Sequence, residues 1–359
     1  MATIQDVAQH AAVSVSTVSN VLNGRTDRMR PETLQRVNAA IEALQFRPSR
    51  LAQQLKTGQT PLIGLLVPSM TNPMYGYTAR EIETVARERF GYRLLLGSTF
   101  RDPVKEGAFL DDLAAQGVRR VIVISSMADE RHLEAAAERG MVVVSYDRGS
   151  TPGRRSKVAH VMPDNFEVGR LATQHLIDQG HRRLAFATVA GMTLARRAKI
   201  DGFMAAAAAA GLEASAQVIN GGPLDEYGDA VIGQAGRTAA LHIAGAASRP
   251  TGVVALNDLM AFGLMAGLRE SGLSVPDDVS VVGLDGHFLA AYFNPMLTTV
   301  QLPVPELARL MVERVMRPQP DVQAGEATPV IPPTGLIVRE SVARPPKVRK
   351  PGSILHAQR

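Results

Sequence analysis

Residues 3–24, TIQDVAQHAAVSVSTVSNVLNG, combine two short helix patterns with a tight turn between them. Thr3 and Asp6 stand three residues apart, as in a capping box that opens a helix. The apolar residues of the first pattern form one stripe at helical spacing: Ile4, Val7, Ala8 and Ala11. A tight turn is expected near 12–14, so the stretch predicts helix, turn and helix in quick succession.

The second helix is predicted over 16–23, with Gly24 as a left-handed stop. Its inward residues would be Val18, Val21 and Leu22. The outward face holds short polar side chains and no acid, which suits base edges and phosphates. Pro31 opens a third helix behind the weak cap Arg30, and its stripe is Leu34, Val37, Ile41 and Leu44. The pattern indicates a helix-turn-helix, with a plain three-helix cap or dimerisation module as the alternative.

The chain of 359 residues is too long for one ordinary domain and suggests two or three. Apolar residues make up 45% of it, enough for a sizeable core. Cysteine is absent, which excludes disulfides, thiolate metal sites and cysteine nucleophiles. The opening MATIQDVAQHAAVS contains an acid and early polar residues, unlike a signal peptide. No apolar run approaches a membrane span, so we expect a cytoplasmic protein without membrane contacts.

The net charge of +5 is distributed unevenly. Residues 1–60 hold seven basic and four acidic residues, and the tail 344–359 holds five basic residues and no acid. The body between them therefore carries a net charge of −3. Basic ends on an acidic body are expected where the ends meet a polyanion.

From residue 62 onward, short apolar runs alternate with helix patterns. The runs are 62–67, 92–98, 119–125, 141–147, 157–164, 182–188, 252–258 and 279–285, and the helix patterns are 75–90, 104–116, 129–139, 165–179, 194–210 and 259–270. This alternation predicts βαβ units and parallel sheets covered on both faces. An extended break near 149–158 divides the series, so we predict an α/β fold with two subdomains. A ligand is expected at the carboxyl ends of the strands.

Polar residues cluster just past the predicted strand ends. They are Ser69 and Asn72, Asp147 and Arg148, Asp164 and Asn165, Asn257 and Asp258, and Asp285. Their equivalent positions favour a cleft that holds a small polar molecule. The alternative is that each Asp or Asn caps the helix that follows it.

The stretch 3–24 strongly resembles the DNA-binding domain of the LacI/GalR family of bacterial transcription regulators. The resemblance continues through RPETLQRVNAAIEALQFRPSRLAQQLKTGQTPLIGLLVPSMTNP, RLATQHLIDQGHRRLAF, ALNDLMAFGLMAGLRESGLSVPDDVSVVGLDG, NPMLTTVQLPVPELARL and LIVRES. It covers all but about the last fifteen residues, with several motifs in the family order. It implies an all-α helix-turn-helix domain at 1–47, a hinge helix and linker at 48–60, and an effector-binding and dimerisation module at 61–343.

The resemblance also implies which residues meet DNA. The base readers would be Val15, Ser16 and Asn20, with Thr17 and Ser19 on phosphates. Backbone phosphates would meet Arg25, Arg28 and Arg30. In the hinge, Leu55 would be the wedge between base pairs, Lys56 a minor-groove contact, and Ser49 and Arg50 neighbours of phosphate.

The effector module is implied to resemble periplasmic sugar-binding proteins, with subdomains at 61–162 plus 296–322 and at 163–295 plus 323–343. The implied effector-binding residues are Ser69, Asn72, Met74, Tyr75, Asp147, Asp164, Arg196, Lys199, Asn257, Asp258 and Asp285. Three positions depart from the usual pattern: Lys199 replaces an arginine, His287 an acid and Leu302 a glutamine. A sugar or sugar acid is the expected effector. The cations at 196–199 favour an anionic group, with a solvated helix face as the alternative.

The implied function is a transcriptional regulator, expected to be a repressor, that binds a pseudo-palindromic operator as a homodimer. Neither a cofactor nor a metal is expected. A transport-type binding protein is the alternative class, and scattered histidines without HExxH or GxSxG argue against an enzyme. The tail 344–359 is expected to be disordered. The sequence leaves open whether the protein represses or activates, and whether its effector induces or acts as a corepressor.

Overall fold

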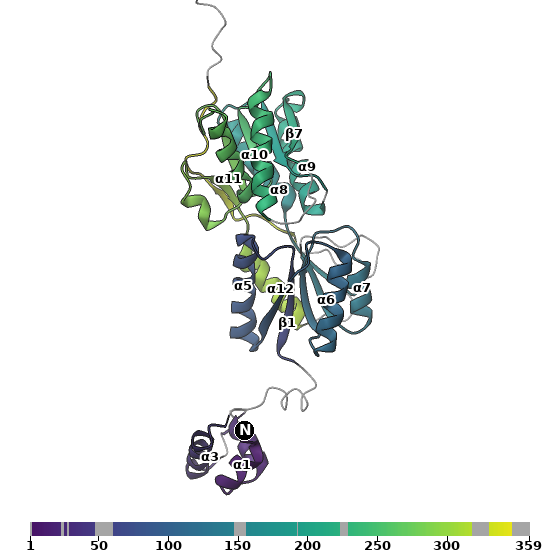
Figure 1. Ribbon diagram of the computed structural model, residues 1–359, viewed down its shortest axis with the longest axis vertical. Coiled ribbons are helices and arrows are strands. Elements are labelled where there is room, and N and C mark those ends of the chain that lie inside the picture. The colour runs from purple at the N-terminus through teal and green to yellow at the C-terminus, as the bar shows by residue number, and fades with distance from the viewer. Residues whose placement is uncertain are drawn as a thin grey trace, which may run out of the picture. The chain divides into compact units, whose positions relative to one another are not determined.

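The computed structural model describes residues 2–22, 25–26, 29–46, 60–146, 156–191, 193–222, 229–317 and 330–346. The chain forms two compact units, 1–60 and 61–359, drawn in Figure 1. Within the described ranges, no helix combines the length and apolar character needed to cross a membrane.

The described residues of the first unit form the helices α1 (Ile4–His10), α2 (Val15–Leu22) and α3 (Pro31–Ala43). The capping box is confirmed, since the Asp6 carboxylate accepts the Thr3 N–H at 2.8 Å and Thr3 Oγ1 accepts the Asp6 N–H at 3.3 Å. Ala12 has a φ of 51°, which makes the tight turn. The three helices meet in one buried core of Val7, Ala8, Ala11, Val18, Val37, Ala40 and Phe46. The predicted stripe residues Ile4, Val21, Leu22, Ile41 and Leu44 pack partly buried against it, whereas the predicted Leu34 is not part of it. Arg30 precedes α3 without a side-chain cap, as predicted.

The second unit contains a first sheet in the order β11-β5-β4-β3-β1-β2, with all pairings parallel. Its strands are β1 (Leu62–Val67), β2 (Arg93–Ser98), β3 (Arg120–Ile124), β4 (Val142–Tyr146), β5 (Ala159–Pro163) and β11 (Val330–Ile331). Its helices are α5 (Pro73–Phe90), α6 (Pro103–Ala115), α7 (Arg131–Glu138) and α12 (Val304–Met316).

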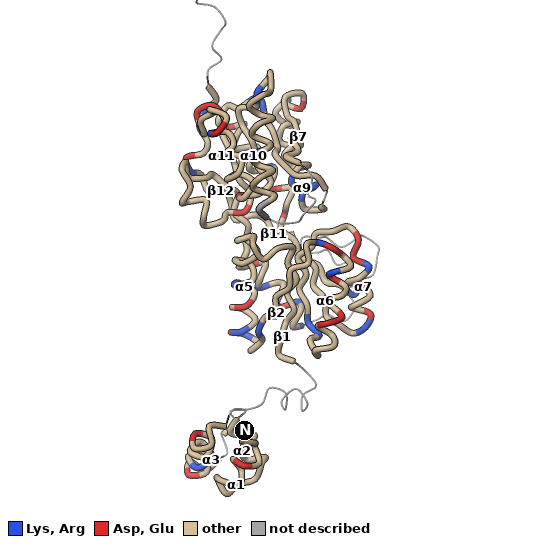
Figure 2. Tube along the Cα trace, in the orientation of Figure 1, with Lys and Arg blue, Asp and Glu red and all other residues tan. Residues whose placement is uncertain are grey.

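The helices cover both faces of this sheet. Ile63 and Leu65 pack with α5 and α12, whereas Leu66 packs with α6 and α7 (Figure 1). Burial on both sides explains why β1 is a continuous apolar run, as parallel strands are. Figure 2 shows charged residues on α5, α6 and α7 and none on β1.

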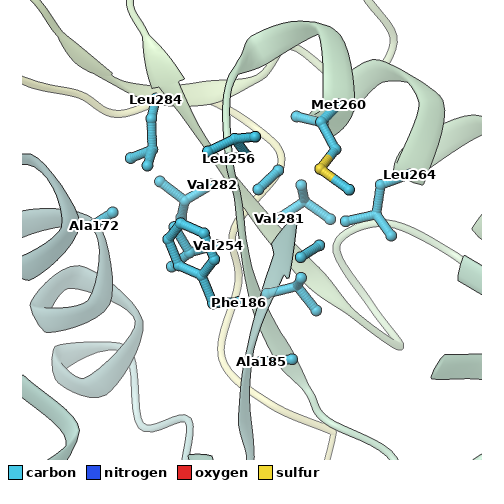
Figure 3. Packing of buried hydrophobic residues seen from close by; sticks show 14 of the residues in the cluster. Ala172, Ala185, Phe186, Val254, Leu256, Met260, Leu264, Val281, Val282 and Leu284 are labelled. Atoms are coloured by element: carbon cyan, nitrogen blue, oxygen red, sulfur yellow. The ribbon is translucent and has the colours of Figure 1, made fainter. Parts of the chain in front are cut away.

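The second sheet has the order β12-β10-β9-β8-β6-β7, and only the β10–β12 pairing is antiparallel. Its strands are β6 (Leu184–Thr188), β7 (Ala216–Asn220), β8 (Gly252–Ala255), β9 (Ser280–Asp285), β10 (Thr298–Gln301) and β12 (Gly335–Ile337). Its helices are α8 (Asn165–Asp178), α9 (Leu194–Ala209), α10 (Asp229–Gly245) and α11 (Asp258–Glu270). Figure 3 shows Ala172 of α8 on one side of the strands and Met260 and Leu264 of α11 on the other.

The helices of this subdomain pack in pairs at backbone contact. A Cβ at Gly202 of α9 would overlap the carbonyl oxygen of Phe166 in α8. A Cβ at Gly263 of α11 would overlap the carbonyl oxygen of Gly233 in α10. Because the paired backbones touch, the two helices of each pair hold their side chains in a fixed relation.

The predicted α/β class with two parallel sheets and an N-terminal helical domain is confirmed. The predicted subdomain boundaries differ from the observed strand positions. The range 296–322, expected in the first subdomain, contains β10, which pairs with β9 of the second sheet. The range 323–343, expected in the second subdomain, contains β11, which pairs with β5 of the first. The sheet that a short strand joins depends on the tertiary structure. The apolar pattern of the strand therefore does not specify its sheet.

Candidate effector site and DNA-binding unit

A cavity of about 820 Å³, its solvent-open mouth included, lies at the carboxyl ends of the strands and is lined by both subdomains. Its lining residues are Asn72, Met74, Tyr75, Thr78, Arg101, Ile124, Tyr146, Pro163, Asn165, Thr193, Ala195, Arg196, Lys199, Ile232, Leu256, Asn257, Asp285 and Leu302. Seven predicted effector residues are among them: Asn72, Met74, Tyr75, Arg196, Lys199, Asn257 and Asp285.

Asn72 and Asn257 each cap a helix and also line the cavity, so the two interpretations of these residues are not alternatives. Asn72 Oδ1 accepts the Met74 N–H at 2.9 Å at the start of α5, and Asn257 Oδ1 accepts the Met260 N–H at 2.9 Å at the start of α11. Both residues also line the cavity. A cap that follows a parallel strand lies at the ligand edge of the sheet, so one side chain meets both requirements.

Three predicted residues do not line the cavity. Asp164 caps α8 by accepting the Glu167 N–H at 2.9 Å, so the capping interpretation holds for it. Ser69 is 3% exposed and bonds within its own loop, where its hydroxyl lies 2.9 Å from Thr71 Oγ1. Asp147 and Arg148 lie outside the described residues.

Asp258, the third of these residues, is buried beneath the cavity wall. Its Oδ1 accepts the Thr299 hydroxyl at 2.7 Å, and its Oδ2 accepts the His287 N–H at 2.8 Å. Burial raises the pKa of Asp258 to about 6, against the opposing effect of these two hydrogen bonds. Asp258 therefore positions the β9–η2 turn, where η2 is Phe288–Ala291, whereas Asp285 lines the cavity.

The cations at 196–199 divide between the cavity and solvent. Arg196 and Lys199 line the cavity and are 7% and 9% exposed, whereas Arg197 is exposed. Nη1 of Arg196 donates to the carbonyl oxygen of Ala190 at 3.1 Å and to that of Gly191. The solvated-face interpretation therefore holds for Arg197 alone.

Several lining residues had no sequence signal strong enough to select them. Arg101 follows β2 between Phe100 and Asp102, and Thr193 opens α9 as its N-cap. Asn165 is the exception, since it stands among the polar residues past the predicted strand ends and lines the cavity. Tyr146 is the last residue of β4. Thr193 could have been found as a cap before a helix, whereas Arg101 required knowledge of the loop's conformation.

The two subdomains are joined by hydrogen bonds at Ser126, just after β3. Its carbonyl oxygen accepts the Leu194 N–H at 3.1 Å, and its hydroxyl accepts the Ala195 N–H at 3.1 Å. Ser126 is buried with a φ of 61°, a left-handed backbone that is strained for a non-glycine residue. A serine of the first subdomain thus caps α9 of the second.

In the first unit, α2 presents the predicted base readers at its surface. Val15 is 42% exposed, and Ser16 and Asn20 are also exposed. Ser14 begins the helix by accepting the Thr17 N–H at 3.2 Å. Helix α2 carries no acid, so its exposed side chains can approach a polyanion without repulsion.

Some of the remaining predicted DNA contacts lie in the described residues and others lie outside them. Thr17 and Ser19 are half-buried, whereas Arg25 and Arg30 are exposed. Arg28 and the hinge residues Ser49, Arg50, Leu55 and Lys56 lie outside the described residues.

The buried His181 has two structural partners. Its Nδ1 lies 3.0 Å from Thr251 Oγ1 and its Nε2 2.9 Å from the Ala343 carbonyl oxygen, which indicates a structural role. Burial lowers the pKa of His181. Across the described ranges, no three His, Asp or Glu side chains gather as a metal-binding group.

A three-helix DNA-binding unit joined to two α/β subdomains around a cavity defines the class of transcription regulators with a periplasmic-binding-protein-like module. Residues 3–49 match the family described as bacterial regulatory proteins, lacI family, and residues 173–342 match a periplasmic binding protein-like domain. The chain is 35% identical over 320 residues to the HTH-type transcriptional repressor PurR of Photobacterium profundum, covering 88% of this chain and 91% of that protein. It is 34% identical over 354 residues to the PurR repressor of Edwardsiella ictaluri, covering 96% and 98%.

Solved structures show the same architecture. The lac repressor dimer bound to operator and the anti-inducer ONPF aligns with a TM-score of 0.78 at 23% identity, covering 95% of this chain and 99% of that one. A complex of the transcriptional regulator CelR with cellobiose aligns with a TM-score of 0.65 at 28% identity, covering 95% and 100%. The chain belongs to the LacI family of bacterial regulatory proteins. It is a DNA-binding transcriptional repressor of that family and not an enzyme.

Proposed function

We propose that this repressor binds a small polar effector, a sugar or sugar acid, between its two subdomains, and that the effector controls operator affinity. The cavity carries the proposal, because Tyr75 and Arg101 of the first subdomain and Lys199 and Asp285 of the second line one space. A ligand that contacts both walls has a higher affinity for one relative position of the subdomains. It therefore shifts the equilibrium between positions.

The proposed effector contacts are the seven predicted residues on the cavity wall, with Arg101, Thr193, Asn165 and Tyr146 added from the structure. A flat wall of Tyr75 and Met74 beside amide, hydroxyl and carboxylate groups suits a polyhydroxylated molecule. The relative CelR, whose solved complex holds cellobiose, supports a carbohydrate ligand for this module. The cytoplasm is the proposed location, since the DNA target lies there.

We further propose that two copies bind a pseudo-palindromic operator. The solved lac repressor is a dimer on its operator, which supports this arrangement. Exposed aromatic residues beside η2 offer an apolar surface for a second copy: Phe288 is 64% and Tyr292 78% exposed. The proposed base readers are Val15, Ser16 and Asn20 of α2.

The hinge proposal assigns Leu55 to the operator centre, as a wedge between two base pairs of the minor groove. Leu55→Ala should remove the operator kink, because alanine is too short to separate stacked bases. Circular-permutation gel shifts would measure the bend, and a normally bent complex would contradict the assignment. Effector binding by the same variant should equal that of the wild type.

The effector proposal is tested by screening sugars, sugar acids and nucleobases for thermal stabilisation of the full-length protein. Each stabilising compound is then added to an operator-binding titration at fixed salt, because phosphate contacts make affinity salt-dependent. A compound that stabilises the protein and changes operator affinity supports ligand control and gives its sign. Stabilising compounds that all leave operator affinity unchanged would contradict it.

A further inference from the structure

Four charged side chains of the described chain line the cavity, and three of them are cations. They are Arg101, Arg196, Lys199 and Asp285. Arg196 is engaged by backbone carbonyl oxygens of the β6–α9 loop. Arg101 and Lys199, in contrast, form no ion pair with any part of the chain that the structure describes.

Lys199 is a buried cation directed at the cavity. Its side chain is 9% exposed and lines the space, and its ammonium has no hydrogen bond within the described residues. The nearby Asp258 carboxylate is affected by the charge of Lys199, but its oxygens are already bonded to Thr299 and His287. The ammonium is thus available to a ligand at the cavity wall, and a ligand anion would supply the charge-assisted partner that the described residues do not.

Arg101 is held in place by a strained loop and two hydrogen bonds. Phe100 and Arg101 have φ values of 57° and 55°, and two successive left-handed non-glycine residues are uncommon. Arg101 Nε donates to the Ser125 carbonyl oxygen at 3.0 Å, and Nη2 donates to the Tyr75 hydroxyl at 2.8 Å. The guanidinium is thus fixed beside the aromatic wall, and its Nη1 edge has no bond to a described residue.

We propose that Arg101 is an effector-binding residue and that, with Lys199, it selects an effector bearing a carboxylate or phosphate group. The inference rests on the proposed function and specifies its ligand. Arg101 comes from the first subdomain and Lys199 from the second, so an anionic ligand in the cavity would neutralise one cation of each. A neutral sugar of the same shape would leave both charges uncompensated.

The test compares matched acidic and neutral ligands by calorimetric titration of the full-length protein. The pairs are gluconate with glucose, galacturonate with galactose, and ribose 5-phosphate with ribose, which separate a carboxylate from a phosphate source. At least one anion should bind about tenfold or more tightly than its neutral partner, the effect of one charge-assisted contact.

Arg101→Gln and Lys199→Gln should each weaken that anion about tenfold or more and reduce its advantage over the neutral partner. Arg101→Lys, which keeps the charge, should retain part of the preference. Arg80→Gln serves as the matched control, because Arg80 lies on α5 of the first subdomain with a side chain 69% exposed. Unchanged melting temperatures would show that the variants are folded.

Equal affinity for the acidic and the neutral sugar of each pair would overturn the anion inference and leave ligand control intact. A preference for the acidic sugar that both glutamine variants retain would have the same consequence. Binding of no anion at millimolar concentration would also overturn it. Ligand control is judged separately, by the effect of neutral sugars and nucleobases on operator affinity.

Discussion

At the scale of single residues, the side chains at the end of a parallel strand combine two tasks. Asn72 and Asn257 both cap a helix and face the ligand cavity, whereas Asp164 only caps. Asp258 lies one position further than Asn257, and its side chain turns under the wall to hold the β9–η2 turn. Of these two neighbouring residues, Asn257 lines the cavity and Asp258 supports its wall.

Asn20 provides a test of sequence recognition. It is exposed on α2, and an asparagine amide can pair with adenine in the major groove. Asn20→Ala should change the base preference at one position of each half-site, at a cost of about 1–3 kcal/mol for the preferred base. Binding to a set of operator variants at constant salt would measure this, and an equal loss on every variant would argue against base reading.

Asp258 provides a test of stability against pH. Its folded pKa of about 6 lies above the ordinary 3.8, so between these values the folded protein keeps a proton that the unfolded chain has released. The free energy of unfolding should therefore fall by up to about 3 kcal/mol as pH rises from 4 to 6. Asp258→Asn should lack this contribution and gain stability relative to the wild type over the same window.

The comparison of the wild type with Asp258→Asn separates the contribution of Asp258 to stability from that of other titrating groups. Burial lowers the pKa of His175, His181 and His287, and these groups raise stability as pH rises toward 6.5, which is the opposite sign. Their contribution is common to both proteins and cancels in the difference. Urea unfolding at several pH values measures this difference in the free energy of unfolding. If the free energies of the two proteins change in parallel with pH, the assigned pKa of Asp258 is refuted.

At the scale of elements, helix pairing in the second subdomain depends on glycines at the contact. Gly263 of α11 faces the backbone of Gly233 in α10, so Gly263→Ala must separate the helices. We expect a loss of several kcal/mol, as for other overpacked contacts. Gly76→Ala in α5 is the matched control with the opposite sign, because a Cβ there meets nothing within 4 Å.

Gly76→Ala should stabilise the protein by about 0.5–1 kcal/mol through helix propensity. Thermal and chemical unfolding of Gly263→Ala and Gly76→Ala would measure the two changes in stability. A tolerated Gly263→Ala would show that α10 and α11 can shift apart, contrary to the packing described above.

At the scale of the whole effector module, Ser126 links the two subdomains. Its hydroxyl and carbonyl oxygen cap α9 across the cavity, next to the lining residues Thr193 and Ala195. The contact stabilises the subdomain arrangement in which both walls line the cavity. It also fixes the start of the helix that carries Lys199.

Ser126→Ala should therefore weaken effector binding about fivefold, since it removes one hydrogen bond worth about 1 kcal/mol between the subdomains. Calorimetry with the effector identified by screening would measure the change. Ser98→Ala is the control, because it removes a hydrogen bond of 3.1 Å to the Pro68 carbonyl oxygen within the first subdomain. Equal losses in both variants would show that Ser126 has no special role between subdomains.

Spacing along the chain was enough to predict the main elements and the α/β class. The capping box of Thr3 and Asp6, the stripe of α3 and the apolar run of β1 depend on spacing over a few residues, and the structure reproduces them. The polar positions past strand ends, together with the family resemblance, also identified seven residues of the cavity wall, because parallel strands bring their carboxyl ends to one edge.

Which side chains converge depends on the tertiary structure. Arg101 reaches the cavity through a left-handed turn, Ser126 bonds the start of α9, and Asp258 turns beneath the wall. The sheet to which β11 belongs is likewise set by the edge strand β5, which is far away in sequence. Hydrophobic periodicity records the environment of a residue within its own element, whereas convergence depends on contacts between residues distant along the chain.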